Sequence, residues 1–146
     1  VRGVPGIDSF QGGFAMSGNR EQQIAMVRTL YEVSGKGEWA AAEAMLTDDF
    51  FVTEAGTLPF AGTYRGRGAL RELFTTVFGS VTVTGLEFKA MTQGDDTVIA
   101  VIELVLGPDN DRVQVAELFR FRGDKVCEIR PYYFDPAPMV AAAAAE

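Results

Sequence analysis

Histidine is absent from this sequence, and cysteine occurs only once. Without histidine the chain lacks the commonest general base and the commonest metal ligand, which excludes Ser-His-Asp catalysis, Cys-His catalysis and zinc sites of the Cys/His kind. The lone Cys127 cannot close an internal disulfide. Any acid–base chemistry must therefore come from carboxylates, tyrosines or lysines.

Positive charge is also scarce, with 13 lysines and arginines against 20 aspartates and glutamates, a formal net charge of -7. Such a surface repels nucleic-acid phosphates and anionic lipid, so we expect neither nucleic acid nor a membrane as a partner. No apolar run is long enough to span a bilayer, and no charged segment followed by an apolar one marks a secretory signal. We expect a cytoplasmic protein that holds no metal and needs no cofactor.

The 146 residues, 47% of them hydrophobic, are enough for one domain with a buried core. Residues 1–18 are glycine-rich and lack periodicity, so we expect a flexible lead-in, with Met16 as a candidate native start. The domain itself is expected over 19–136. An alanine-rich tail, 137–146, follows it, and we place no function in either end.

The body divides into a helical half and a strand half. Helices are expected from Asn19 to Ser34, over 38–46 and over 67–77. A strand at 49–54 is followed by a glycine-rich loop at 55–66. Four further strands, separated by turns of glycine, aspartate and asparagine, are expected at 81–92, 96–106, 111–122 and 125–135. Helices followed by consecutive hairpins favour an α+β fold, with the helices on one face of an antiparallel sheet.

Strand alternation places one carboxylate on an apolar face. Val113, Val115, Phe119 and Phe121 point to one side of their strand, and Glu117 belongs to the same series. An unpaired buried carboxylate costs several kcal/mol, so it either pairs or takes up a proton. Glu117 is therefore a candidate pocket residue.

A second carboxylate ends an apolar row in the same way. Phe50 and Val52 share a face with Glu54 on the 49–54 strand. Two inward carboxylates suggest a cavity with a chemical purpose. The alternative, for either glutamate, is a side chain rotated to solvent or tied to an arginine such as Arg65.

The strand from Thr97 to Leu106 is apolar on both faces. An antiparallel sheet with one wet face alternates more cleanly. We expect helices to cover one face and a second subunit to cover the other, which predicts a homodimer. A locally thick core is the alternative.

Several local strings resemble a known superfamily. They are GKGEW, LTDDFFVTEAG, LPFAGTYRGRGALRELF and AELFRFRGDKVCEIRPYYFDP. With the order of elements, they make residues 20–136 similar to the ketosteroid-isomerase-like, SnoaL-like superfamily, also called nuclear-transport-factor-2-like. The resemblance implies a cone in which helices back a strongly curved, mixed or antiparallel sheet around an apolar pocket. This fold hosts many activities, so the motifs specify the fold better than the function.

The resemblance also implies site residues. The general base of ketosteroid isomerase falls on Glu54, and its oxyanion-hole carboxylic acid falls on Glu117. The oxyanion tyrosine of its first helix falls on Leu30, one position before Tyr31. Glu54, Glu117 and Tyr31 are therefore the candidate catalytic residues.

The apolar pocket of such a fold would be completed by residues from the helices and the inner sheet face. The candidate ligand-binding residues are Trp39, Leu30, Val52, Phe74, Val115, Phe119, Ile129 and Tyr133. The implied function is a cofactor-free enzyme of the isomerase, polyketide cyclase or epoxide hydrolase type, acting on a small apolar molecule. The histidine-dependent dehydratases of the same fold are excluded. The alternative is a non-catalytic small-molecule-binding or dimerisation domain.

Overall fold

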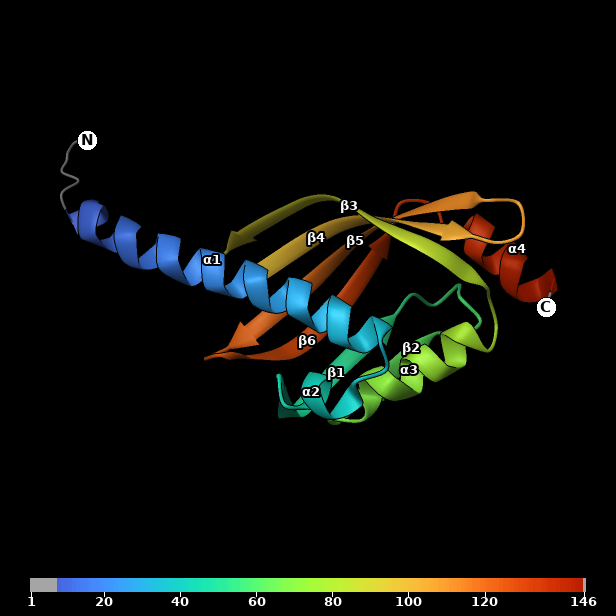
Figure 1. The fold of residues 1–146 in the computed structure, drawn as a ribbon, viewed down its shortest axis with the longest axis horizontal. Helices are drawn as coiled ribbons and strands as arrows, with labels where there is room; N and C mark the ends of the chain where they lie inside the picture. Colours follow the sequence, from blue (N-terminus) through green and yellow to red (C-terminus); the bar gives the residue numbers. More distant parts are fainter. Residues whose placement is uncertain (1–7, 146) are drawn as a thin grey trace.

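The computed structural model describes residues 8–145, with side chains from residue 19 onward. The fold is α+β, as the sequence predicts (Figure 1). Its elements, in chain order, are α1 (Asp8–Gly35), α2 (Trp39–Glu43), β1 (Leu46–Glu54), β2 (Gly62–Arg65), α3 (Ala69–Phe78), β3 (Val83–Gly94), β4 (Thr97–Leu106), β5 (Asp111–Arg122), β6 (Lys125–Tyr133) and α4 (Ala137–Ala145).

The six strands form one mixed sheet in the order β2-β1-β6-β5-β4-β3. The four long strands β3 to β6 pair antiparallel in sequence order, which confirms the predicted hairpins. Asp95 and Asp96 connect β3 to β4 with φ of 52° and 58°, a left-handed conformation that aspartate tolerates in tight turns. β1 lies parallel to β6 and carries β2 as an antiparallel edge strand.

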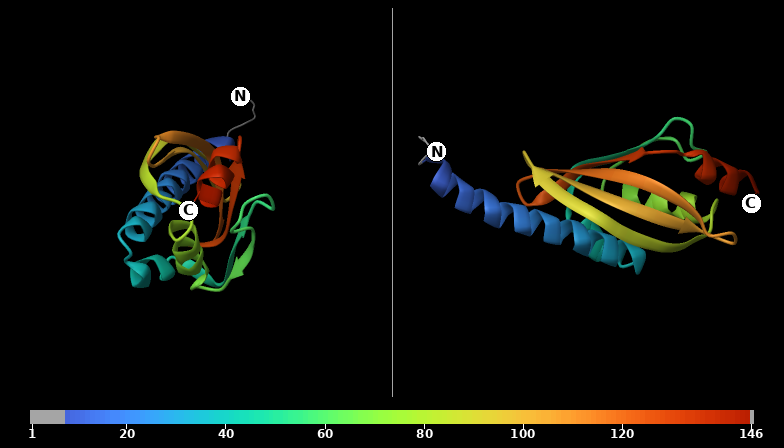
Figure 2. Two further views of the ribbon diagram at one scale, coloured as in Figure 1. Left: turned by 90° about the vertical axis from the view of Figure 1, so that its right-hand side faces the viewer. Right: turned by 90° about the horizontal axis from the view of Figure 1, so that it is seen from above.

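The sheet curves around the helices (Figure 2). α1 packs on β3 and β4, α3 packs on β1 and β2, and α4 contacts β5. One face of α1 is buried: Val27, Leu30 and Ser34 on it are only 0%, 2% and 3% exposed. The inner face of the sheet and these helices enclose the core.

The element boundaries differ from the predicted ones in the first half of the chain. α1 begins at Asp8, inside the stretch expected as a flexible lead-in; residues 1–7 lie outside the described residues. The expected 38–46 helix shortens to α2, and the 55–66 loop contains β2. β2 has only four residues, starts at a glycine and is mostly exposed, so it carries no apolar alternation that the sequence could show.

The alanine-rich tail is a helix with a core contact. α4 covers Ala137–Ala145, and its Met139 is 1% exposed. Within the described residues, no helix is long and apolar enough to cross a membrane.

Candidate active site

A pocket of about 370 Å³ opens between α1, α3 and the inner face of the sheet. This volume falls within the range of small-molecule sites. Its lining is mostly apolar and comprises Leu30, Tyr31, Ser34, Gly35, Val52, Glu54, Leu70, Leu73, Phe74, Val77, Phe78, Val83, Thr84, Gly85, Leu86, Ile102, Leu104, Glu117, Phe119, Ile129, Pro131, Tyr133 and Met139.

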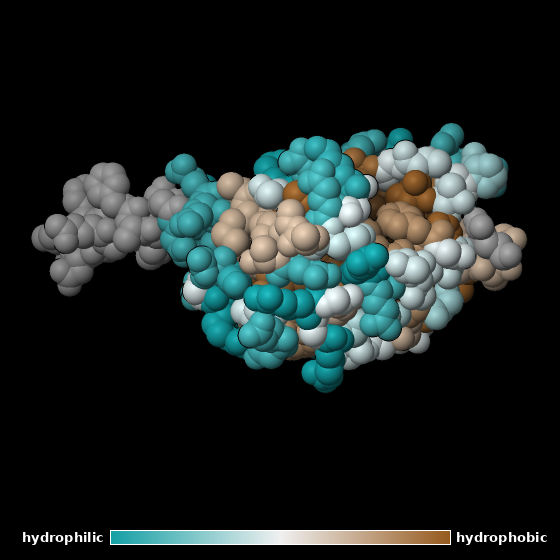
Figure 3. Space-filling model, turned by 60° about the horizontal axis from the view of Figure 1, so that its bottom comes forward, coloured by the Kyte–Doolittle hydropathy of each residue, from teal (hydrophilic) through white to brown (hydrophobic). Residues whose placement is uncertain are grey.

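The pocket reaches the surface at an apolar rim. Phe78 and Leu86 line the pocket and are 54% and 39% exposed, although both are large hydrophobic side chains. Figure 3 shows apolar surface gathered toward the end of the molecule that carries α4. An apolar ligand therefore meets an apolar entrance.

The two carboxylates share one row across three strands. Glu117 of β5 lies opposite Pro131 of β6, and Val52 of β1 lies beside Ile129 of β6. Two residues further along β1 and β6, the alternation puts Glu54 beside Pro131 on the same face. With strands about 4.8 Å apart, the backbones of the two glutamates are about 10 Å apart. Both glutamates line this same pocket.

Each carboxyl group accepts a hydrogen bond from one tyrosine. The Tyr31 hydroxyl donates to Oε1 of Glu117. The Tyr133 hydroxyl lies 3.4 Å from Oε1 of Glu54, long for an O–H···O bond and therefore weaker. The site thus contains two carboxyl groups and two phenols.

Aromatic packing fixes the position of Tyr31. Its ring meets Phe88 and Phe119 edge to face, with centroids 5.1 and 5.5 Å away. The Arg28 guanidinium in turn covers the Phe88 ring at 5.4 Å. Such packing holds the phenol against Glu117 and restricts its rotamers.

Burial dominates the electrostatics of both carboxyl groups. Burial, together with the charge of Glu117, raises the pKa of Glu54 from 4.5 to about 8, and the Tyr133 hydrogen bond opposes that rise. Burial likewise raises the pKa of Glu117, against the hydrogen bond from Tyr31. The pKa values of Tyr31 and Tyr133 are raised first by burial and then by the neighbouring carboxylates, so both phenols stay protonated donors.

Because the charge of Glu117 opposes ionisation of Glu54, the pair loses its two protons in separate steps. Over the interval between these steps it holds a single proton. A site of this kind offers one carboxylate that takes a proton and one carboxylic acid that donates a hydrogen bond, which is the arrangement needed for proton transfer next to a developing oxyanion.

Most of the sequence-predicted site residues meet in this pocket. The three candidate catalytic residues line it, and so do six of the eight candidate ligand-binding residues: Leu30, Val52, Phe74, Phe119, Ile129 and Tyr133. Trp39 and Val115 are not among the lining residues. The Trp39 ring packs edge to face on Phe74 at 5.2 Å, and Val115, 2% exposed, lies in the core.

Many lining residues were not predicted from the sequence, and two groups of them stand out. Val83, Gly85 and Leu86 come from the start of β3, and Met139 comes from α4. Leu70, Leu73 and Val77 of α3 also line the pocket, and their helical spacing is the sequence signal that could have found this wall. Nothing in the alanine-rich tail distinguishes Met139 as a pocket residue.

No group of histidine, cysteine, aspartate and glutamate side chains within the described part of the chain could hold a metal ion.

Comparison with known proteins identifies the class of fold. The chain resembles Bal32a from a soil-derived mobile gene cassette, with a TM-score of 0.74, 20% identity, and coverage of 85% of this chain and 98% of that one. It also resembles a Xanthomonas campestris protein of unknown function with a cystatin-like fold, with a TM-score of 0.71, 17% identity, and coverage of 83% and 97%. A third likeness is to an NTF2-like protein of Burkholderia thailandensis, with a TM-score of 0.66, 24% identity, and coverage of 85% and 97%. These likenesses establish the NTF2-like, cystatin-like α+β fold.

The family follows from the sequence itself. The model of the SnoaL-like domain matches residues 27–129, so the chain belongs to the SnoaL-like family. The resemblance noted in the sequence is confirmed. A search of curated proteins finds no match.

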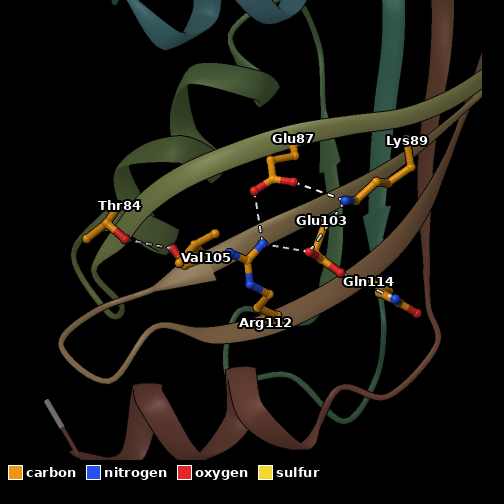
Figure 4. Close-up of polar contacts among 7 residues, drawn as sticks. All are labelled: Thr84, Glu87, Lys89, Glu103, Val105, Arg112 and Gln114. Carbon is orange, nitrogen blue, oxygen red and sulfur yellow. Dashed lines mark hydrogen bonds and ion pairs between the residues drawn. The ribbon is translucent and has the colours of Figure 1, made fainter.

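The outer sheet face carries a different kind of polar group. Glu103 of β4, 8% exposed, accepts hydrogen bonds from Arg112 at 2.7 Å and Gln114 at 3.3 Å, and Lys89 lies 3.8 Å away. Glu87 pairs with both Arg112 and Lys89, at 2.9 and 3.0 Å (Figure 4). The positive charges of this cluster offset the negative charge of the buried Glu103, which lies on the face of β4 that points away from the pocket.

Proposed function

We propose that this protein is an acid–base enzyme that moves a proton on a small, largely apolar, carbonyl-bearing substrate. The single observation that carries the proposal is the placement of Glu54 and Glu117, each beside a tyrosine, in one apolar pocket. The SnoaL-like and NTF2-like fold includes isomerases and cyclases, and such a substrate suits both kinds of chemistry.

Glu54 is the proposed proton-exchanging group. A general acid or base works best when its pKa lies near the working pH. The pKa of about 8 lets Glu54 take a proton from substrate and return it under near-neutral conditions.

Glu117 and Tyr31 form the proposed oxygen-binding side of the site. Burial raises the pKa of Glu117, so the single proton that the pair holds can lie on Glu117 while Glu54 is the carboxylate. In that state Glu117 and the protonated Tyr31 phenol both donate hydrogen bonds to a substrate oxygen as it gains negative charge. In the related isomerase a tyrosine aligned with Leu30 does this work. Here the hydroxyl one residue later reaches the carboxyl group, which supports the same role for Tyr31.

Among the family chemistries, proton-transfer reactions of the isomerase or cyclase type fit this pocket best. An epoxide hydrolase of the family uses an arginine between two acids. Among the described residues, no arginine or lysine lines the pocket.

Deuterium uptake from heavy water tests the proposal without knowledge of the natural substrate. A panel of small apolar ketones and β,γ-unsaturated ketones is incubated with the protein, and incorporation next to the carbonyl is followed by mass spectrometry. We expect uptake above the buffer rate, and a loss of at least about a hundredfold in Glu54→Gln, the usual size of a general-base contribution. Ketones that bind without exchange would instead support a non-catalytic small-molecule-binding domain.

We also propose that two copies associate through the outer sheet face. On β4, Ile99, Val101 and Val105 point away from the core, and they are only partly exposed in the single chain. Apolar side chains on that face are the usual material of a homodimer interface. A cytoplasmic location is proposed as well, on the basis of Cys127, which is a buried free thiol.

A further inference from the structure

Four glutamates of the sheet, three of them buried and Glu117 partly buried, fall into two classes. On the outer sheet face, Glu103 pairs with Arg112 at 2.7 Å, and Glu128 pairs with Arg120 at 3.1 Å. In the pocket, the partners of Glu54 and Glu117 among the residues whose side chains are described are neutral phenols alone. Among the described residues, each of the two carboxylates on the outer face therefore pairs with an arginine, and neither carboxyl group in the pocket does.

This difference leaves the pocket wall without positive charge. No lysine or arginine belongs to its described lining, whereas two carboxyl groups do. A carboxylate removed from water is stabilised most by a cation with hydrogen-bond donors aimed at it. Inside the pocket only a bound molecule can supply that cation.

We propose that the pocket also binds apolar amines in their ammonium form, with the ammonium group between Glu54 and Glu117. This assignment rests on the proposed function only for the location of the site, and it adds a ligand class that does not depend on catalysis. The organic part of the amine occupies the apolar remainder of the cavity.

The geometry suits an ammonium group in two ways. Pro131 lies between the two glutamates in their row and has no polar side chain, so it places no hydrogen-bond donor between the carboxylates; the donors to them are the neutral phenols of Tyr31 and Tyr133. An ammonium group has three N–H donors, enough to reach both carboxylates. Phe74, Phe78 and Phe119 line the same cavity and offer aromatic surface to the rest of the ligand.

The protonation state of the pair gives the proposal a distinctive signature. An ammonium ligand prefers the ionised carboxylates, so its binding competes with protonation. Its affinity therefore rises with pH until Glu54, with a pKa of about 8, is ionised. A neutral ligand that accepts a hydrogen bond from the carboxylic acid loses affinity over the same interval.

Three probes of nearly equal shape separate these cases: phenylbutylamine, phenylbutanol and phenylbutyrate. Their dissociation constants are measured by isothermal titration calorimetry at about pH 6, 7 and 8, where the amine stays cationic. We expect the amine to bind at least about tenfold more tightly than the alcohol at about pH 8, with an affinity that rises by up to about tenfold per pH unit. The carboxylate should bind weakest at every pH.

Matched variants connect the effect to the two glutamates. Glu54→Gln and Glu117→Gln should each weaken amine binding by about tenfold or more and leave alcohol binding within about twofold. Glu32→Gln removes one exposed charge from α1 and should leave all three probes unchanged, which controls for net charge. Circular dichroism confirms that each variant is folded.

The proposal is overturned if the folded protein does not bind the amine, if the alcohol binds as tightly, or if amine affinity does not change with pH. None of these results bears on deuterium uptake by ketones. Conversely, tight amine binding without ketone exchange would overturn only the proposed enzymatic function.

Discussion

Replacement of Glu54 by glutamine should make the protein more stable at alkaline pH. The carboxyl group is 7% exposed, and burial with the charge of Glu117 raises its pKa from 4.5 to about 8. Between these two values the folded protein holds a proton that the unfolded chain releases. The free energy of unfolding of the wild type therefore falls as pH rises through this interval.

The size of the effect follows from the two pKa values. Each tenfold change in an acidity constant is worth about 1.4 kcal/mol, so a rise from 4.5 to about 8 costs the ionised folded protein about 5 kcal/mol. The stabilising contribution of the neutral form is complete below about pH 4.5 and is lost by about pH 8. Glutamine has nearly the same shape as glutamate and can still accept the hydrogen bond from Tyr133. Because it does not ionise, the variant does not lose stability as the pH rises.

Urea unfolding of the wild type and of Glu54→Gln at about pH 5, 6.5 and 8 measures this difference. We expect the wild type and Glu54→Gln to have nearly equal free energies of unfolding at the lowest pH. At the highest pH, the free energy of unfolding of the variant should exceed that of the wild type by several kcal/mol. Glu103→Gln is the control of opposite sign. The Arg112 hydrogen bond lowers the pKa of Glu103, so this variant should lose stability at neutral pH. A stability difference for Glu54→Gln that stays constant with pH would refute the electrostatic reasoning.

Three further changes test other parts of the structure. Tyr31→Phe removes the hydrogen bond to Glu117. The pKa of Glu117 should then rise further in a carbon-13 NMR titration, and the free energy of unfolding should fall by about 1–3 kcal/mol. Met139 is 1% exposed and forms part of the pocket wall, so Met139→Ala leaves a cavity there. The free energy of unfolding in urea should fall by about 2–5 kcal/mol, and bulkier apolar ligands should bind more tightly. Leu118→Arg places a charge on the outer sheet face, next to Ile99; sedimentation should then show a monomer where the wild type is a dimer, and a monomeric wild type would contradict the proposed assembly.

Local patterns in the sequence predicted the sheet face on which Glu54 and Glu117 lie. The period-two alternation of Val115, Glu117 and Phe119 places the glutamate inward, and the structure agrees for these three residues. The turn residues between the long strands predicted the hairpins for the same local reason. Strand alternation and turn residues are set by a few neighbouring residues, so they can be recognised without knowing which distant segments come into contact.

The distance between the two glutamates could not be predicted in the same way. It depends on the parallel pairing of β1 with β6, whose residues Val52 and Ile129 meet although they are far apart in the chain. Alternation within one strand does not reveal which strand will be its neighbour. The resemblance to a known family implied that both glutamates belong to one site, but it did not specify which strands pair.

Two differences between the expected and the observed pocket lining have side-chain explanations. Trp39 is not a lining residue, and its ring instead packs edge to face on Phe74, which does line the pocket. Met139 was overlooked because a helix of alanines has no polar face to contrast with an apolar one, so periodicity cannot show which residue turns inward.

The parallel pairing of β1 and β6 also affects how the protein folds. The strands β3 to β6 pair with their neighbours in sequence and close short loops, whereas β1 must wait for β6, the last strand to be synthesised. Long-range parallel pairing carries a large loop-closure entropy and slows folding. Glu117 can reach its place as the hairpins form, but Glu54 joins it only when β1 docks. The two carboxylates therefore begin to repel each other only late in folding, when β1 docks on β6. Refolding at acidic pH keeps both groups protonated and should make this docking step faster.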